Sequence, residues 1–371
     1  MKLPLEGVRV LDLSHMLPGP FSTMLMADMG AEVIKIEPPS GDSFRARKPF
    51  IHEESTAFLM VNRGKKSCVL DLRSQEGHDN FLKLAASADI ILEQFRPGVV
   101  ERLGIDYATI REVNPGIIYV SMSGFGQDGP YRDMPGHDIN YLSISGILDT
   151  IGQKGGAPAL PGIQIADMCG AQWALISVLL ALASREKNGG LGQYADLSIT
   201  DAVFPWLSLF LSDYLSNGTV SSRGSTKAGG AYAFYNVYET ADGRFVSLGA
   251  AEPKFWANFC RTVGREDWIP RQMDPAMIPE LRGMFKCRTQ KDWRELLFHA
   301  DCCFTPVNNI EEALNDPQLT HRRMEINVPC HSGGQVMNFA FPVKFSEMRA
   351  KDAAPVPQFG EHNAQLINDT K

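Results

Sequence analysis

The stretch VRVLDLSHMLPGPFSTMLMADMGAEVIKIE, residues 8–37, holds two apolar strand patterns with a turn and a helix-like segment between them. The runs 8–13 and 31–37 are rich in Val, Ile and Leu, and the segment that separates them ends on Gly30. Apolar strands that alternate with helices are typical of a parallel sheet covered on both faces. The stretch therefore predicts an α/β fold with a mostly parallel sheet.

The same strand pattern recurs at 67–72, 89–95 and 117–123, and ligands of such sheets bind beyond the carboxyl ends of the strands. A long helix is expected from Asp167, because Asp is a common N-cap residue and the segment closes on Lys, Asn and two glycines. A second apolar helix is expected over about 199–215.

The polar, glycine-rich segment 216–231 indicates a linker to a smaller α+β domain. That domain starts with two alternating runs joined by Asp242-Gly243, a strong hairpin signal, and continues with helical patterns. After about residue 325 the chain returns to strand-like and proline-rich sequence. We expect a large domain of 1–215, a small domain of 216–325 and a C-terminal segment of 326–371.

Composition indicates a soluble globular protein, since 44% of the 371 residues are hydrophobic and 21% are charged. The net charge of −7 argues against nucleic-acid binding. The seven cysteines form no CxxC pair, which favours reduced thiols in the cytoplasm over a disulfide framework or a zinc site. The N-terminus lacks a signal-peptide core, and the apolar run 171–183 is shorter than the ~18 residues of a membrane span. We expect neither a membrane span nor a metal.

Two further patterns bear on ligands. GFGQDG at 124–129 matches a dinucleotide-binding motif, but Pro130 and further turn residues follow where a helix should open, so nicotinamide binding is disfavoured. Basic residues gather in the first hundred positions, and at the ends of parallel strands they suit a polyphosphate ligand. For any one of them, a solvated surface is the more common explanation.

Three residues in separate segments carry the candidate chemistry. His137 alone is more often a structural histidine, Asp167 is explained as a helix cap worth ~1 kcal/mol, and Glu252 as a partner of a helix dipole before Pro253. Taken together, an imidazole and carboxylates in a glycine-rich setting can support proton transfer.

Long stretches of the chain resemble the family III CoA-transferases, the CaiB/BaiF group. They are residues 5–42, NRGKKSCVLDL (62–72), EQFRPGVVERLGIDY (93–107), SMSGFGQDGPY (121–131), ADMCGA (166–171) and FGEHNAQL (359–366). Within the group, GHDINYLSISGIL (136–148), residues 229–256 and TPV (305–307) resemble the α-methylacyl-CoA racemase branch.

The resemblance implies a large Rossmann-like domain completed by the C-terminal segment, a small domain, and an interlocked homodimer whose active sites draw on both subunits. It assigns His137 and Asp167 as an acid/base pair and Glu252 as the support of the histidine. In the CoA-transferases, the position of Asp167 is instead a nucleophile that forms an aspartyl thioester.

The resemblance also implies contacts to coenzyme A, which enters as part of the substrate thioester and not as a cofactor. One departure is Pro38, where relatives often carry an arginine, so that Lys35 or a basic residue of 45–48 would take over its contact. The implied binding residues are Lys35, Leu70, Asp71, Leu72, Arg73, Gln94, Phe95, Arg96, Arg102, Gly136, Asp138, Ile139, Asn140 and Tyr141.

The expected activity is racemisation of 2-methylacyl-CoA thioesters, in which His137 and Asp167 remove and return the α-proton. We expect backbone N–H groups at the start of the Asp167 helix to stabilise the enolate, Gly136 to clear space for the substrate, and Asp138 and Asn140 to hold their own loop. Two alternatives stay open: CoA transfer between acids through Asp167, and a CoA-binding protein without catalysis.

Overall fold

The computed structural model describes residues 2–368, which form two compact units. Unit 1 comprises the residues up to Ser145, Ile163–Pro205 and the chain from Pro317 onward, whereas unit 2 comprises Gly146–Gly162 and Trp206–Asp316. The borders differ from the predicted 1–215, 216–325 and 326–371. Residues 146–162 leave the large unit, although their glycine- and proline-containing sequence is that of an ordinary loop, and unit 1 resumes before the predicted border.

Unit 1 is built on a parallel six-stranded sheet with the order β5-β2-β1-β6-β7-β8. Five strands fall inside predicted runs or within one residue of them. The sixth, β8, was not predicted, because its sequence QYADLS is polar and its first residues are mostly exposed at the sheet edge. The strands are β1 (Arg9–Leu13), β2 (Glu32–Glu37), β5 (Lys66–Val69), β6 (Ile90–Glu93), β7 (Ile118–Ser123) and β8 (Gln193–Ser198).

From β1 the chain adds β2 and β5 on one side of the sheet, and it then adds β6, β7 and β8 on the other side. The change of side lies between β1 and β6, and doubly wound sheets have a crevice at this position, outside the carboxyl ends of the strands. Leu13 pairs with Glu93 at the end of the two strands. The turn that follows Leu13 and the segment Gln94–Arg96 that follows β6 therefore lie at the same edge. This edge is where a doubly wound sheet binds its ligand.

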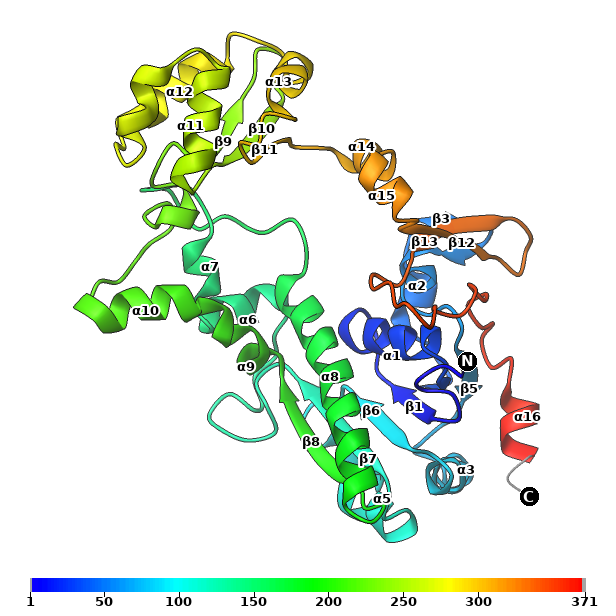
Figure 1. Ribbon diagram of the computed structural model, residues 1–371. Coiled ribbons are helices and arrows are strands. Elements are labelled where there is room, and N and C mark those ends of the chain that lie inside the picture. Colours follow the sequence, from blue (N-terminus) through cyan, green and yellow to red (C-terminus); the bar gives the residue numbers. More distant parts are fainter. Residues whose placement is uncertain (1, 369–371) are drawn as a thin grey trace. The chain divides into compact units, whose positions relative to one another are not determined.

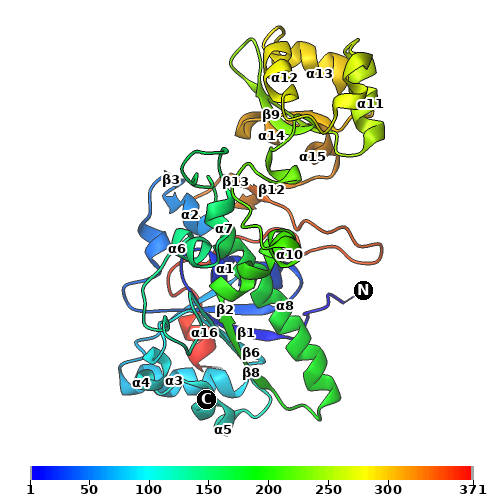
Figure 2. The ribbon, with the colours of Figure 1, turned by 90° about the vertical axis from the view of Figure 1, so that its left-hand side faces the viewer.

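Helices cover both faces of this sheet, as predicted. Helices α3 (Gln75–Ala86), α5 (Tyr107–Val113) and α16 (Asn363–Asn368) contribute side chains to one buried cluster with the strands. Helices α1 (Pro18–Asp28) and α8 (Ile165–Lys187) pack against each other, and α8 also contacts β7 (Figures 1 and 2). The remaining elements of unit 1 are η1 (Ser43–Ala46), β3 (Phe50–Ile51), β4 (Glu54–Ser55), α2 (Thr56–Leu59), α4 (Val99–Leu103), α6 (Asp138–Ile144), α9 (Ile199–Val203), α15 (Pro317–His321), β12 (Glu325–Pro329) and β13 (Gln335–Phe339).

Helix α8 is longer than its most apolar run. By length and composition alone, Ile165–Lys187 could cross a membrane, which corrects the expectation that this segment is too short. Its residues Ala171, Ala174, Val178 and Ala181 are nevertheless buried in unit 1, where the helix packs on α1 and β7. Helix α8 therefore packs as a core helix on one face and is exposed on the other.

The helix predicted over 199–215 is divided into three pieces. Helix α9 gives way to the 3₁₀ turn η2 (Phe204–Leu207), and α10 (Ser208–Asn217) follows. Pro205 explains the break, because proline lacks the N–H that a continuous helix needs.

Unit 2 contains a three-stranded antiparallel sheet with the order β11-β10-β9. The hairpin predicted around Asp242-Gly243 joins β9 (Tyr235–Glu239) to β10 (Phe245–Gly249). Helices α11 (Pro253–Thr262), α12 (Met277–Phe285) and α13 (Gln290–Leu297) lie within the helical patterns at 253–264, 276–285 and 290–299. They enclose an aromatic core with Trp256, Phe285 and Trp293. The unit also holds α7 (Ile147–Thr150), η3 (Lys227–Gly229), η4 (Glu266–Arg271), β11 (Phe304–Pro306) and α14 (Ile310–Leu314).

Candidate functional site

His137 and Asp167 lie at the starts of two helices of unit 1. His137 is the N-cap residue of α6 and is exposed. Asp167 lies in the first turn of α8, whose N-cap is Gln164, so Asp167 is not itself the cap that the sequence suggested. The Asp167 carboxyl therefore does not serve as the N-cap of α8 and can take part in proton or acyl transfer.

Asp138 joins the two segments. Its Oδ1 accepts hydrogen bonds from the backbone N–H of Ala166 at 2.6 Å and from that of Asp167 at 3.1 Å. These are first-turn amides of α8, which have no acceptor inside the helix. The expectation that these amides stabilise an enolate is therefore wrong, because a carboxylate of the chain itself already occupies them.

The surroundings of Asp167 change its acidity. Burial and the nearby Asp138 carboxylate raise the pKa of Asp167 to about 6, while His137 acts to lower it. The charge of His137 therefore acts on the Asp167 carboxyl, although the two residues lie at the starts of different helices. At neutral pH both the ionised and the protonated form of Asp167 are accessible.

Tyr141 fills the space beside these groups. Its hydroxyl donates to the carbonyl of Gly136 at 2.6 Å, and its ring makes an edge contact with Phe125. A Cβ at Gly136 would lie 2.6 Å from the ring of Tyr141. Gly136 thus makes room for this buried tyrosine, and not for a substrate as expected. Asn140 holds the loop as predicted, since its Oδ1 accepts from the N–H of His137 at 3.0 Å.

Arg96 follows the end of β6 and acts electrostatically on Tyr141. Burial first, and then Asp167 and Asp138, raise the pKa of Tyr141 to about 12, whereas Arg96 acts to lower it. Arg96 is exposed and therefore open to a ligand. Its charge thus acts on the same tyrosine as the acid/base residues, although the residues are far apart in sequence.

The predicted contact Lys35 is buried and already paired. Its ammonium donates to the carbonyl of Ser14 at 2.8 Å and lies 2.7 Å from Asp42. Arg45, another candidate to replace the arginine missing at Pro38, forms two bonds to Glu37. Arg47 and Lys48 are the exposed cations of the 45–48 segment. The charges of Lys35 and Arg45 are therefore already paired within the protein, without a ligand.

The remaining predicted contacts divide by exposure. Asp71, Arg73 and Arg102 are exposed, and Ile139 and Asn140 are exposed at the start of α6. Leu70 is buried in the core of the sheet and Leu72 packs against it. The first group is accessible to a ligand, whereas Leu70 is held by the core.

Glu252 belongs to unit 2, where it is the exposed N-cap residue of α11. Its predicted support of His137 in unit 1 stays a prediction. The turn after β7 behaves as expected from Pro130, because the described chain forms no helix between GFGQDG and the start of α6 at Asp138.

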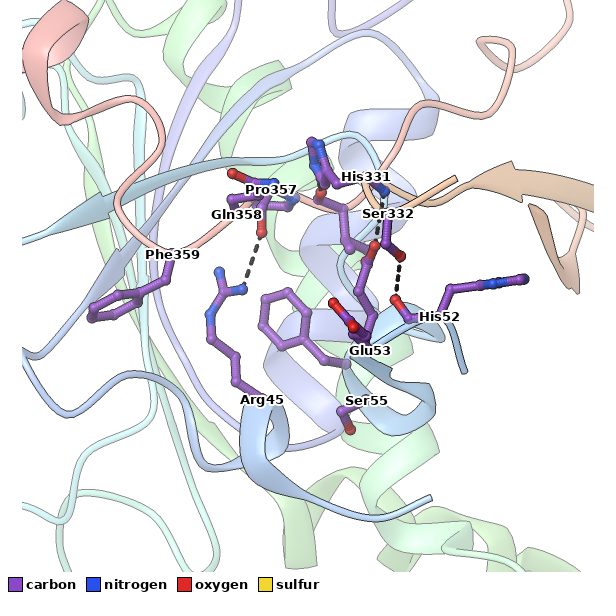
Figure 3. Close-up of a pocket in the computed structure, with 12 residues that line it drawn as sticks. Arg45, His52, Glu53, Ser55, His331, Ser332, Pro357, Gln358 and Phe359 are labelled. Atoms are coloured by element: carbon purple, nitrogen blue, oxygen red, sulfur yellow. Dashed lines mark hydrogen bonds between the residues drawn. The ribbon is translucent and has the colours of Figure 1, made fainter. Parts of the chain in front are cut away.

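A separate pocket of about 440 Å³ lies in unit 1 between the β3–β4 hairpin and the C-terminal segment (Figure 3). Ser332 donates to the carbonyl of His52, and the N–H of His331 donates to Glu54 at 2.8 Å. Arg45 also lines the pocket, and its guanidinium stacks on Phe58 at 3.9 Å from the ring centre. These contacts hold the walls of the pocket together.

The parallel sheet with helices on both faces defines a doubly wound α/β protein. The family model CoA-transferase family III matches residues 5–363, and the chain belongs to this family. The resemblance seen in the sequence is thereby confirmed.

The curated relatives include both activities of this family. The chain is 34% identical to the α-methylacyl-CoA racemase of Mus musculus, over 98% of this chain and 93% of the relative. It is 30% identical to the succinyl-CoA:glutarate CoA-transferase of Homo sapiens, over 99% of this chain and 86% of the relative. A CaiB/BaiF family protein from Brucella suis has a similar structure, with a TM-score of 0.88 and 27% identity over the whole of both chains.

The sequence points to His137 and Asp167 but does not reveal the bond of Asp138 to α8. The two partners of this bond lie 28 and 29 positions away along the chain. No local motif reports such a contact. The one signal in the sequence is an acidic residue directly after the candidate histidine.

Proposed function

We propose that this protein racemises 2-methylacyl-CoA thioesters by moving the α-proton between His137 and Asp167. The observation that carries the proposal is the bond from the N–H of Asp167 to Asp138 at 3.1 Å, which brings Asp167 to the His137 segment, where burial and Asp138 raise the pKa of Asp167 to about 6. Asp167 can therefore act as the base in its ionised form and as the acid in its protonated form, which are the two roles that racemisation exchanges between Asp167 and His137.

Racemisation needs this symmetry. In one direction the base removes the α-proton from one face of the carbon, and the protonated partner returns a proton to the other face. The reverse direction uses the same groups in exchanged roles. A carboxyl with an ordinary pKa of ~3.9 would rarely be protonated at neutral pH and would be a poor acid for this step.

The CoA part of the substrate would bind at the edge where β1 and β6 end. Arg96 lies there, and the exposed Arg73 and Arg102 are further partners for its phosphates. Glu252 would hold the tautomer of His137, as the resemblance implies. The relative from Mus musculus named as a racemase supports racemisation as the activity.

CoA transfer is the second candidate, and the relatives named as CoA-transferases support it equally. The Asp167 carboxylate would attack the carbonyl of an acyl-CoA, giving a mixed anhydride and the CoA thiolate. The thiolate would then attack the Asp167 carbonyl, release the acid and leave an aspartyl thioester. This route needs the ionised form of Asp167 and has no role for His137.

The test is incubation of the enzyme with one epimer of a 2-methylacyl-CoA in D2O without an acceptor acid. Racemisation predicts deuterium at the α-carbon, which mass spectrometry measures, and loss of chirality, which chiral chromatography measures. His137→Ala and Asp167→Asn should each slow both processes by ~10²–10⁴-fold, since each removes an acid or a base.

The two candidates give different results. Absence of exchange, together with capture of Asp167 as a hydroxamate by hydroxylamine, would overturn the racemase proposal in favour of CoA transfer. Under that mechanism Asp167→Asn abolishes the adduct, whereas His137→Ala leaves it in place. Exposed Asp133 supplies the control, because Asp133→Asn removes an acid outside the site.

A further inference from the structure

The side chain of Asp138 joins the His137 segment to the start of α8 by hydrogen bonds. Asp138 follows His137 directly, and its carboxylate accepts from the N–H groups of Ala166 and Asp167. Gln164, the N-cap residue of α8, forms no capping bond with its side chain. The helix thus takes its cap from a residue of another helix.

We propose that Asp138 is a positioning residue that fixes Asp167 and His137 relative to each other by capping α8 from the start of α6. This inference goes beyond the binding of CoA that the resemblance implies for Asp138. Its effect on α-proton exchange rests on the proposed function, but its effect on Asp167 itself does not.

The geometry explains how one carboxylate fixes two residues. The N–H of Asp167 is held at 3.1 Å from the Asp138 carboxylate, so the backbone that carries the reactive carboxyl cannot rotate freely. His137 is bound to Asp138 through the peptide bond, and its own N–H donates to Asn140. A displacement of about 1 Å in such a site can slow a reaction by about a hundredfold.

Asp138 also sets the charge around Asp167. The titratable groups that face Asp167 are Asp138, His137 and Tyr141, and Arg96 faces Tyr141. Asp138 is the largest electrostatic influence on the pKa of Asp167 after burial, and it acts to raise that pKa. The same group that holds the helix therefore favours the protonated form of Asp167.

The test separates the charge from the hydrogen bonds. Asp138→Asn keeps an oxygen that can accept from both N–H groups but removes the charge, whereas Asp138→Ala removes both. The titration of Asp167 is followed by NMR of enzyme labelled with ¹³C at the aspartate carboxyl, with the signal assigned by its loss in Asp167→Asn. Asp106→Asn is the matched control, because one oxygen of Asp106 also accepts from two first-turn N–H groups, those of Ala108 and Thr109, although Asp106 caps its own helix α5.

We expect both Asp138 variants to move the Asp167 midpoint to lower pH, and Asp106→Asn to leave it unchanged. Asp138→Ala should also slow α-proton exchange by about tenfold to a hundredfold at its own pH optimum, with Asp138→Asn recovering most of that loss. An unchanged Asp167 midpoint in Asp138→Asn, or full exchange activity in Asp138→Ala, would overturn the proposal.

Failure of the proposed function would give a different result from failure of the Asp138 proposal. If the wild-type enzyme exchanges no α-proton but forms the hydroxamate at Asp167, racemisation is excluded. The NMR midpoint and the yield of that adduct in the same variants then decide the role of Asp138 on their own.

Discussion

Glu93 is a buried acid at the end of β6, directly before the segment Gln94–Arg96. It is 1% exposed, and its Oε2 accepts from the N–H of Phe95 at 2.7 Å. Burial raises its pKa to about 7, opposed by bonds from Ser121 and Phe95 and assisted by the charges of Glu101 and Asp196. At neutral pH this carboxyl is therefore close to half ionised in the folded protein.

The raised pKa predicts that Glu93 lowers stability as the pH rises. In the unfolded chain the group loses its proton near the ordinary glutamate pKa of 4.5, but in the folded protein only near 7. Between these values the folded state binds more protons, so its stability falls as the pH rises, by roughly 3 kcal/mol in all at about 1.4 kcal/mol per pKa unit. Glu93→Gln removes that slope.

Guanidinium unfolding at pH 5 and pH 8 measures this effect. The variant should lose less stability than the wild type between the two pH values, even if its stability at pH 5 is lower. The exposed Glu112→Gln is the control and should keep the wild-type dependence. A Glu93→Gln slope equal to that of the wild type would contradict the assignment.

Which residues could be found from the sequence depends on whether their chemistry is local. His137 stands out because its stretch is otherwise mostly apolar, small or amide, and Asp167 because it lies at the predicted start of a long helix. Lys35 looked like a phosphate contact, since a cation at the end of an apolar strand suits one. The sequence could not reveal that Asp42, seven positions later, folds back to pair with it inside the protein.

At the scale of elements, the strands that are easiest to predict are the buried ones. The strands β1, β6 and β7 are almost entirely buried, and Val, Ile and Leu are frequent in them. Strand β8 belongs to the same sheet but exposes most of its first four residues, so its composition is that of a loop. Edge position, which only the assembled sheet defines, explains the difference.

The other edge strand, β5, is closed by the C-terminal segment. The side chain of Asn363 accepts from the N–H of Val69 at 2.8 Å and donates to the carbonyl of the same residue at 3.0 Å, as a paired strand would. His362 adds a backbone bond to Ser67, and α16 contacts β5 (Figure 1). One amide thus satisfies an exposed strand edge.

Asn363→Ala should loosen this closure. The loss of two hydrogen bonds to the edge predicts a destabilisation of about 1–3 kcal/mol and faster hydrogen exchange at the Val69 amide. Hydrogen exchange with mass spectrometry resolves the two edges, and β8 should be unaffected. Asn315→Ala, which removes a side-chain bond to Glu311 in unit 2, is the control. Unchanged protection at Val69 would show that the amide does not hold the edge.

At the scale of the whole molecule, the order of the segments could be predicted better than their grouping. A polar linker was expected between two domains, whereas the chain leaves unit 1 twice, at residues 146–162 and at 206–316. The first departure is short and resembles an ordinary loop in composition. Which segments belong to one unit depends on contacts between residues far apart in the sequence, and local sequence patterns do not predict such contacts.

The exposed face of α8 predicts that the protein is a dimer. Trp173 and Ile176 are 41% and 40% exposed, and Leu180, one turn further along the same face, is 64% exposed. An apolar stripe on a core helix marks an interaction surface, and the family resemblance implies an interlocked second copy. Analytical ultracentrifugation should therefore give twice the mass of the chain at micromolar concentration.

Leu180→Glu tests whether this face forms the contact. A charge in place of a leucine buried between subunits should raise the dimer dissociation constant by at least about tenfold, because burial of such a side chain is worth about 1.5–3 kcal/mol. Val113 on α5 is also exposed, so Val113→Glu is the control and should leave the dimer intact. Since Leu180 is exposed in the single chain, the variant should keep its circular dichroism spectrum. A wild-type monomer, or a Leu180→Glu dimer as tight as the wild type, would rule out α8 as the subunit contact.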